Sequence, residues 1–386
     1  MNQSWFEYSA QECRLVEESD SWRRPKSFDT SDANDSSGIL DDGGSAGGRV
    51  VAFASNDYLG MTTHHAVVTA AHDALDRWGT GSGASRLITG SRPVHHELES
   101  ELASWKGEDR AILFPTGFAA NLGVLTTFGH PGAVILSDEL NHASIVDGSR
   151  LAKAEVRVYR HSDVDHLGRL LKEVGGRPVI VVTDLVFSMD GDIAPVDKIA
   201  RLCRHHGALL VTDEAHSVLG PDPTAVLADI AHLRVGTLSK TLGSIGGFVA
   251  GPTRFIELLE NKARSYIFTT AIPPADAAAA LAALRIMRGP EGTVLINRLR
   301  SHVDAIAPSH PSGGHPSPIV PIVLGSEEAA LFASAQLLAA GLWVPAIRPP
   351  TVPKGTSRLR VTLSASHDSD DVERLAGELK RIRDSI

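Results

Sequence analysis

Residues 208–243 read ALLVTDEAHSVLGPDPTAVLADIAHLRVGTLSKTLG. Two short apolar runs in this stretch, Ala208–Val211 and Arg234–Leu238, have the length and composition of buried strands. Asp213 follows the first run and Lys240 follows the second. In open α/β sheets ligands sit at the carboxyl ends of the strands, which is where both charged side chains fall. An acid buried there is costly unless it meets a cation, so this pair marks the place to look for chemistry.

The alternation of short apolar runs and helical patterns extends on both sides of this stretch. Helical patterns at Asp163–Val174 and Val196–His206 are each followed by glycine, a common helix stop signal. Near-continuous apolar strands that alternate with helices predict an α/β fold, in which helices cover both faces of a mostly parallel sheet. The seven expected strands are Ala111–Phe114, Ala133–Leu136, Glu155–Tyr159, Pro178–Val182, Ala208–Val211, Arg234–Leu238 and Gly247–Ala250.

The pattern changes after about residue 290, and a chain of 386 residues is long enough for a second, smaller domain. We expect an N-terminal arm and loop over residues 1–49, a large domain over 50–289 and a small α+β domain over 290–386. Residues 1–28 resemble a polar helical arm, and the Gly-, Ser- and Asp-rich segment 31–48 predicts a mobile loop. The small domain is expected to contain helices Glu327–Ala340 and Ser369–Ile386 and strands Pro318–Leu324 and Arg358–Leu363.

Composition excludes several classes of protein. The net charge of −9 and the lack of a Lys/Arg run argue against nucleic acid or an anionic membrane as the main partner. No apolar stretch reaches the roughly 18–20 residues needed to cross a bilayer, and the acidic N-terminus is not a secretory signal. Only two cysteines, Cys13 and Cys203, are present, so we expect a reducing, cytoplasmic setting.

Asp213 and Lys240 together indicate pyridoxal phosphate (PLP). This cofactor needs a lysine to bind it covalently, a carboxylate for its pyridinium nitrogen and a cradle for its phosphate. Most lysines are solvated surface charges, but Lys240 follows a strand and stands among small residues and glycines. The run Phe114–Asn121 passes from a strand through Gly117 into a helix, whose N-terminus would suit a phosphate, although plain strand–helix turns look alike.

Two further strand ends carry polar side chains that suit a cofactor ring. His142 could stack on the ring, and Ser188 could donate a hydrogen bond near it; an ordinary loop histidine is the simpler alternative for His142. A metal site is not expected. The 17 histidines include adjacent pairs that point to different faces of a helix, and no His, Cys and Asp set has a ligand spacing.

From about residue 50 to the C-terminus, the chain resembles the α-oxoamine synthases, a branch of the fold-type I PLP enzymes. Within that branch it is most similar to the members that make 8-amino-7-oxononanoate for biotin. The motifs that carry the resemblance are Ser55–Gly60, Gly81–Gly83, Thr116–Asn121, Asn141–Ser144, Phe187–Asp192, Asp213–His216, Thr237–Lys240 and Arg348–Pro353.

The resemblance implies a role for each matching residue. Lys240 would carry PLP covalently, Asp213 would pair with the pyridinium, His142 would stack on the ring, and His216 and Ser188 would bond near its phenolic oxygen. Gly117, Phe118 and Thr237 would help bind cofactor and phosphate. In a homodimer with shared active sites, Thr269 and Thr270 would reach the partner's phosphate. The substrate contacts would be Arg348 on the amino acid carboxylate, Thr351 and Arg23 on the acyl substrate, and Asn56 and His142.

The implied reaction condenses L-alanine with a pimeloyl thioester, carried on coenzyme A or an acyl carrier protein, and releases CO2 and the thiol. Alternatives are a 2-amino-3-oxobutyrate ligase, a 5-aminolevulinate synthase, a secondary-metabolite acyltransferase, an aminotransferase or a non-catalytic binding module. The chain departs from the family pattern in the short loop Ser217–Pro223, in the compact segment Ile306–Pro318 and in its N-terminal arm.

Overall fold

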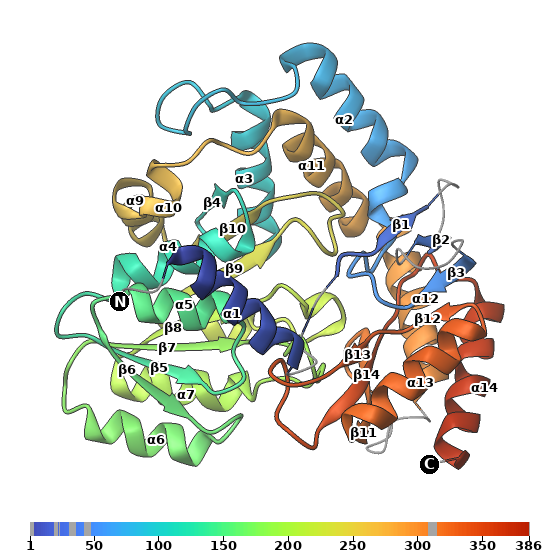
Figure 1. Cartoon of the computed structure of the whole chain (residues 1–386). Helices are drawn as coiled ribbons and strands as arrows, with labels where there is room; N and C mark the ends of the chain where they lie inside the picture. Colours follow the sequence, from blue (N-terminus) through green and yellow to red (C-terminus); the bar gives the residue numbers. More distant parts are fainter. Residues whose placement is uncertain are drawn as a thin grey trace.

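The computed structural model describes residues 4–18, 22, 24–30, 36–41, 48–307 and 315–385. Its centre is a seven-stranded sheet with the order β4-β10-β9-β8-β7-β5-β6, seen in Figure 1. Neighbouring strands pair in parallel except at β10, which is antiparallel to β4 and β9. The strands are β4 (Arg110–Phe114), β5 (Val134–Asp138), β6 (Glu155–Tyr159), β7 (Val179–Asp184), β8 (Leu209–Asp213), β9 (His232–Thr237) and β10 (Gly247–Gly251). All seven predicted strands are confirmed.

Each face of the sheet has its own apolar core, because successive side chains of a strand point to opposite faces. In β7, Ile180 and Val182 join one core, while Val179 and Val181 join the other. Helices α4 (Gly117–Phe128), α5 (Ala143–Leu151), α9 (Thr253–Lys262) and α10 (Arg264–Ile267) belong to the first side, and α6 (Val164–Glu173) and α7 (Val196–His206) to the second. The strands are therefore buried on both faces, as near-continuous apolar runs predict.

Further helices pack against the β4 and β10 part of the sheet, where Leu113 and Phe248 join their apolar core, or lie in the connecting segments. Helix α11 packs against α2 and α3, as Figure 1 shows. These elements are α2 (His65–Trp78), α3 (Pro93–Lys106), α8 (Thr224–Leu227), α11 (Pro274–Arg288) and the short 3-10 helices η1 (Met61–Thr63) and η2 (Ser217–Leu219).

The C-terminal part is an antiparallel sheet with helices, as predicted. Its three strands have the order β11-β14-β13. The elements are α12 (Pro290–Ile306), β11 (Ile319–Gly325), α13 (Glu327–Ala339), β12 (Leu342–Trp343), β13 (Ala346–Ile347), β14 (Ser357–Thr362) and α14 (Ser369–Ser385). Helix α12 begins at the proposed boundary of residue 290. One apolar core crosses that boundary, with Leu284 of α11 and Leu299 of α12 both fully buried in it.

The prediction that residues 31–48 form a loop is wrong in part. Ser37–Asp41 forms strand β2, which pairs with β1 (Ser27–Asp29) and β3 (Gly48–Ala52); β12 completes a sheet with the order β1-β2-β3-β12. The strand forms because its pattern alternates and Leu40 is buried, a signal hidden among the surrounding Gly, Ser and Asp residues. Residues 31–35 and 42–47 of this segment, and 308–314 of the compact segment Ile306–Pro318, lie outside the described residues.

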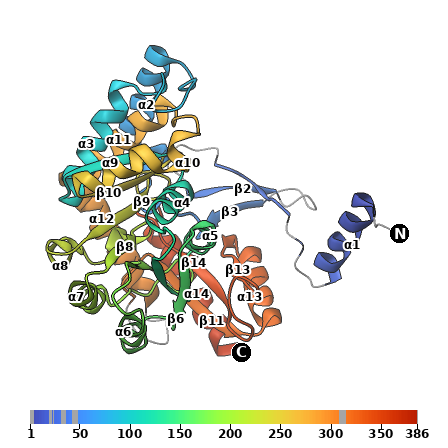
Figure 2. The ribbon, with the colours of Figure 1, turned by 90° about the vertical axis from the view of Figure 1, so that its left-hand side faces the viewer.

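Helix α1 (Trp5–Glu18) stands away from the rest of the chain in Figure 2. It has no buried residue, and Trp5 and Phe6 are 80% and 91% exposed. An isolated helix of this length is only marginally stable in water, so packing of its apolar side chains against another surface would stabilise it. Within the described ranges, no helix has the length and apolar character needed to cross a membrane.

Candidate active site

The carboxyl ends of β7, β8 and β9 meet at one edge of the central sheet. Asp184 and Asp213 are the last residues of β7 and β8, and Lys240 follows β9 by three residues. All three line one cavity of about 170 Å³, together with His142 and His216. The structure thus brings together the lysine, the carboxylate and both histidines that the sequence singled out.

Asp213 is a buried carboxylate held by neutral donors. It is 7% exposed. Its Oδ2 accepts a hydrogen bond from the Asn121 amide at 2.7 Å, and its Oδ1 accepts one from the Ala215 N–H at 3.0 Å. These donors orient the carboxylate without cancelling its charge, so a cationic group in the cavity would be strongly favoured.

Lys240 is positioned by a turn that requires glycine. Gly243 has a φ of +58°, and a Cβ on it would lie 2.6 Å from the Thr62 nitrogen, so other residues are excluded there. Burial lowers the pKa of Lys240, although the charges of Asp213 and Asp184 raise it. A partly desolvated amine with a lowered pKa is a better nucleophile and base than a surface lysine.

The N-terminus of α4 opens onto the same cavity. Thr116 caps the helix by accepting the Ala119 N–H, and Gly117, Phe118 and Thr237 line the cavity beside it. The helix N-terminus offers unpaired N–H groups and the positive end of the helix dipole. This end of the cavity therefore suits a phosphate.

A chain of hydrogen bonds connects His142 with Asp213. The imidazole Nδ1 of His142 lies 2.8 Å from the Ser144 hydroxyl, which accepts a bond from the Asn121 amide, and the same amide donates to Asp213. Asn121 Oδ1 is buried and has no partner among the described residues. His142 itself stays exposed at the cavity edge, where a flat ring could lie against it.

His216 belongs to a second network that reaches the C-terminal sheet. Its Nδ1 lies 2.5 Å from the Tyr58 hydroxyl, which in turn lies 3.3 Å from Asn56 Oδ1. Arg360 of β14 donates to Asn56 Oδ1 at 3.2 Å and to the Ser188 carbonyl at 2.7 Å. Burial holds the pKa of His216 well below its usual range, and Lys240 and Arg360 lower it further, so its imidazole is neutral.

The sequence matches the family model described as aminotransferase class I and II over residues 48–379. An 8-amino-7-oxononanoate synthase of Burkholderia thailandensis is 46% identical over 353 residues, covering 86% of this chain and 89% of the relative. One of Anaeromyxobacter dehalogenans is 47% identical over 344 residues, covering 85% of each. This chain belongs to the 8-amino-7-oxononanoate synthase family. The predicted resemblance is confirmed.

Solved structures agree with the fold of this family. A serine palmitoyltransferase from S. paucimobilis with a bound PLP–myriocin aldimine has a TM-score of 0.89 at 29% identity, covering 98% of both chains. The 8-amino-7-oxononanoate synthase of Francisella tularensis has a TM-score of 0.71 at 28% identity, covering 87% of this chain and 98% of the other. The predicted fold type, enzyme class and dependence on PLP are those of the family.

Other predicted residues lie outside the lysine cavity. Ser188 and Thr351 line a larger neighbouring cavity of about 600 Å³. Thr269 and Thr270 lie in the turn between α10 and α11, half-buried and exposed respectively. Their roles in the oxononanoate synthase reaction stay predictions.

The two predicted arginines are placed differently. Arg348 follows β13, and its guanidinium lies 3.6 Å from the carboxylate of Glu327 at the start of α13. Arg23 lies outside the described residues, so its predicted contact with the acyl substrate stays a prediction.

Four polar residues of the site were not predicted from the sequence: Asp184, Asn121, Tyr58 and Arg360. Asp184 had a signal, because it ends an apolar run in the same way as Asp213 does. Asn121 and Tyr58 lie within the family motifs, but nothing in those motifs indicated a role for them. Arg360 alternates with apolar residues in an ordinary strand pattern, and only its long-range contacts reveal it.

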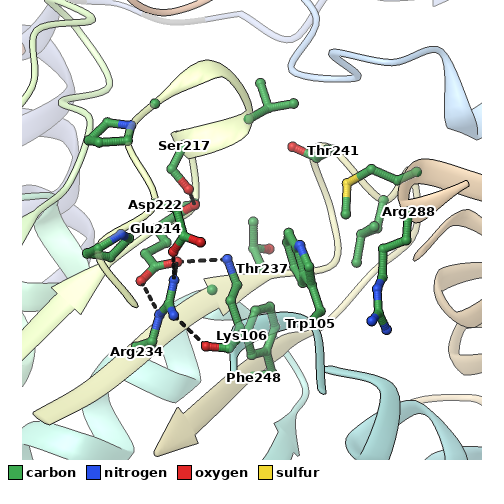
Figure 3. A pocket seen from close by; sticks show the side chains of 18 of the residues that line it. Trp105, Lys106, Glu214, Ser217, Asp222, Arg234, Thr237, Thr241, Phe248 and Arg288 are labelled. Atoms are coloured by element: carbon green, nitrogen blue, oxygen red, sulfur yellow. Dashed lines mark hydrogen bonds and ion pairs between the residues drawn. The ribbon is translucent and has the colours of Figure 1, made fainter. Parts of the chain in front are cut away.

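Another cavity, of about 310 Å³, adjoins the lysine cavity and shares Thr237 with it. Figure 3 shows the buried ion cluster on its wall, in which Glu214 accepts hydrogen bonds from Lys106 at 2.7 Å and from Arg234 at 2.6 Å. Because Glu214 follows Asp213, the cluster fixes the end of β8. Its two cations compensate the charge of this buried carboxylate. Among the described residues, no cluster of His, Cys, Asp and Glu is arranged to hold a metal ion.

Proposed function

We propose that this chain condenses L-alanine with a pimeloyl thioester to form 8-amino-7-oxononanoate, CO2 and free thiol, in the cytoplasm and for biotin synthesis. The observation that carries the proposal is the placement of Lys240 and Asp213 in one cavity, in a chain of this family.

The residues of the cavity fit PLP. Asp213 is a buried carboxylate whose donors, the Asn121 amide and the Ala215 N–H, are both neutral, and it would pair with the pyridinium nitrogen. The N-terminus of α4 would take the phosphate, and the Lys240 amine would take the aldehyde carbon. When bound, PLP supplies an electron sink for the charge that develops at the amino acid Cα.

Arg360 is our candidate for the carboxylate of L-alanine. It is buried, and its guanidinium contacts neutral acceptors: the carbonyl of Ser188, the amide oxygen of Asn56 and the Thr362 hydroxyl. A desolvated cation surrounded by neutral groups favours an incoming anion. Arg348, the residue suggested by the family resemblance, already lies near Glu327 and is the alternative.

The proton of the substrate Cα would pass to Lys240. Its amine lines the cavity, and burial lowers its pKa toward the range in which an amine accepts a proton at neutral pH. His142 at the cavity edge would lie against the cofactor ring, and the neutral imidazole of His216, fixed by Tyr58, would bond near the phenolic oxygen. These contacts orient the substrate Cα for loss of its proton and attack on the thioester.

The larger cavity is our candidate for the acyl thioester. Asn141, which precedes His142 in the chain, lines this cavity, as do Ser188, Thr351, Val352 and Pro353. Its lining combines apolar side chains with a few polar groups, as expected for an acyl chain or a pantetheine arm. Either coenzyme A or an acyl carrier protein could bring the chain, and both belong in the test.

We propose a homodimer with shared active sites. Phe118, which lines the lysine cavity, has an exposed side chain, and so do three other large apolar residues: Ile88, Ile245 and Phe268. Helix α1 adds further unburied apolar surface. Exposed apolar groups of this size favour burial against a second copy, which would bring Thr269 and Thr270 to the partner's phosphate.

A thioester panel tests the proposed reaction. Purified protein loaded with PLP is given L-alanine or glycine with pimeloyl, acetyl or succinyl thioesters, the pimeloyl group on coenzyme A and on a carrier protein. We expect thiol release and a product of the mass of 8-amino-7-oxononanoate only with L-alanine and a pimeloyl thioester. Faster turnover of glycine with acetyl or succinyl thioester would refute the substrate assignment.

A further inference from the structure

His161 lies between two acidic side chains at the wall of the larger cavity. Its Nδ1 is 2.9 Å from Asp138 Oδ1, and its Nε2 is 2.8 Å from Asp192 Oδ2. An ionised carboxylate only accepts hydrogen bonds, so both ring nitrogens carry a proton and the ring is an imidazolium. Burial alone would lower the pKa of His161, but the hydrogen bonds to the two aspartates raise it to about 10.

Asp138 connects His161 to the turn that carries His142. Asp138 is the last residue of β5, and its side chain is 1% exposed. Its Oδ1 accepts the Leu140 N–H at 2.9 Å, and its Oδ2 accepts the Ser162 N–H at 2.8 Å. Because Leu140 lies two residues before His142, the carboxylate shapes the path of the chain into α5.

Asp192 connects His161 to the turn that carries Ser188. The Asp192 carbonyl accepts the Phe187 N–H at 3.0 Å, and the Phe187 carbonyl accepts the Gly191 N–H at 2.8 Å, which closes the turn around Ser188. The His161 ring meets the Phe187 ring edge-on, with centroids 4.4 Å apart. Asp192 Oδ1 is buried without a hydrogen-bond partner in the described residues, so among these residues the His161 ring is the side chain that holds this carboxylate.

We propose that His161 is a positioning residue whose imidazolium holds these two turns in register, so that His142 and Ser188 reach the cofactor together. The inference rests on the proposed function, in which His142 lies against the cofactor ring, and on the predicted hydrogen bond of Ser188 near that ring. The other charged groups that face the same cavity are Arg358 and Asp190, which pair with each other, and Glu139. His315 also faces it and bonds to the Asp190 carbonyl.

Removal of the imidazolium would leave two carboxylates without their common partner. The cost falls on Asp138, whose side chain is 1% exposed and would become an uncompensated buried charge, whereas the 39% exposed side chain of Asp192 can turn to water. The two turns would then separate or take up water, and a catalytic group displaced by about 1 Å loses on the order of a hundredfold in rate. The effect should reach the cofactor geometry, although His161 does not line the lysine cavity.

The test compares His161→Gln with His232→Gln, a matched control. His232 also pairs with a buried carboxylate, Glu108 at 2.8 Å, but it starts β9 at the end of the sheet away from Lys240. We expect both variants to lose thermal stability. Only His161→Gln should change the visible circular dichroism of bound PLP at equal occupancy, and only it should lower kcat for thiol release by about ten- to a hundredfold.

Asp192→Asn provides a second variant in case His161→Gln fails to fold. It keeps the side-chain volume and weakens one of the two anchors, so we expect the same change in circular dichroism with a smaller amplitude. Wild-type circular dichroism and kcat in either folded variant would overturn the inference. A wild-type enzyme that binds PLP but releases no thiol would instead refute the proposed function, and the circular dichroism comparison would still decide the role of His161.

Discussion

Asp184 and Asp213 are register partners at the carboxyl ends of the parallel strands β7 and β8. Both are buried, and Asp184 accepts the His142 N–H at 3.1 Å. Burial and the neighbouring charge of Asp213 hold the pKa of Asp184 well above its usual range. Two buried carboxyl groups at neighbouring strand ends disfavour each other's charge, so ionised Asp184 is costly in the fold.

Asp184→Asn should stabilise the fold in a pH-dependent way. Folding raises the pKa of Asp184 from its ordinary value of 3.8, so wild-type stability falls as pH rises above that value toward the pKa in the fold. Asparagine does not ionise, so it carries no free-energy cost of a buried charge, and its amide oxygen can still accept the His142 N–H. Urea unfolding of the PLP-free proteins should give a stability gain that grows from pH 4 to pH 8. A gain that shrinks with pH would mean that Asp184 is ionised in the fold.

Lys240→Ala should abolish turnover, because we propose that Lys240 supplies the amine that holds PLP and moves the substrate proton. We expect thiol release to fall by about a thousandfold or more, the scale seen when a covalent catalyst is removed. The absorbance band of lysine-bound PLP should vanish at the same time. Lys198→Ala, which removes an exposed lysine of α7, serves as the control and should leave both unchanged. A surviving band in Lys240→Ala would refute the assignment.

Arg360→Lys and Arg348→Lys distinguish the two candidates for the substrate carboxylate. Lysine keeps the charge but loses the two-pronged geometry of a guanidinium, and a hydrogen bond to a charged group contributes about 1.5–3 kcal/mol. Arg360→Lys should therefore raise the KM for L-alanine by about ten- to a hundredfold, while Arg348→Lys should change it little. The reverse result would return the role to Arg348.

The central sheet and the meeting of Asp213 and Lys240 in one cavity were predictable because their signals are local. Runs such as Leu209–Asp213 combine strand length, apolar composition and a polar residue at the carboxyl end, and neighbouring parallel strands bring such residues to one edge. Family motifs added roles for His142 and His216. The strand at Ser37–Asp41 was missed because its weak alternation stands among loop-forming residues.

The network of His216, Tyr58 and Arg360 could not be predicted in the same way. These residues are separated by more than a hundred positions, and nothing in their local sequences indicates that they meet. Arg360 in particular looks like any polar residue that alternates with apolar ones along a strand. Whether Arg360 reaches the site depends on how the C-terminal sheet packs against the segment that carries Asn56. Only the tertiary structure specifies that packing.

A subunit-mixing experiment tests the shared active site. Lys240→Ala lacks the amine, and a Thr269→Ala, Thr270→Ala double variant should bind PLP weakly in the partner's site. If each site takes its lysine from one subunit and its threonines from the other, a mixed dimer contains one intact site. Reassembly of equal amounts should restore about a quarter of wild-type activity. Absence of any recovery, with mixed dimers confirmed by mass, would place the threonines with the lysine of their own subunit.

The ion pairs of His161 should make stability depend on pH in a defined window. A histidine whose pKa rises from 6.5 to about 10 on folding stabilises the fold fully below pH 6.5, and this contribution is lost as pH rises toward 10. The difference in free energy of unfolding between wild type and His161→Gln should therefore be largest at pH 6 and shrink up to pH 10. His95→Gln supplies a control of opposite sign. Burial lowers the pKa of His95, so wild type should lose stability relative to that variant as pH falls below 6.5. A flat difference for His161→Gln across the window would show that the ring is not an imidazolium in the fold.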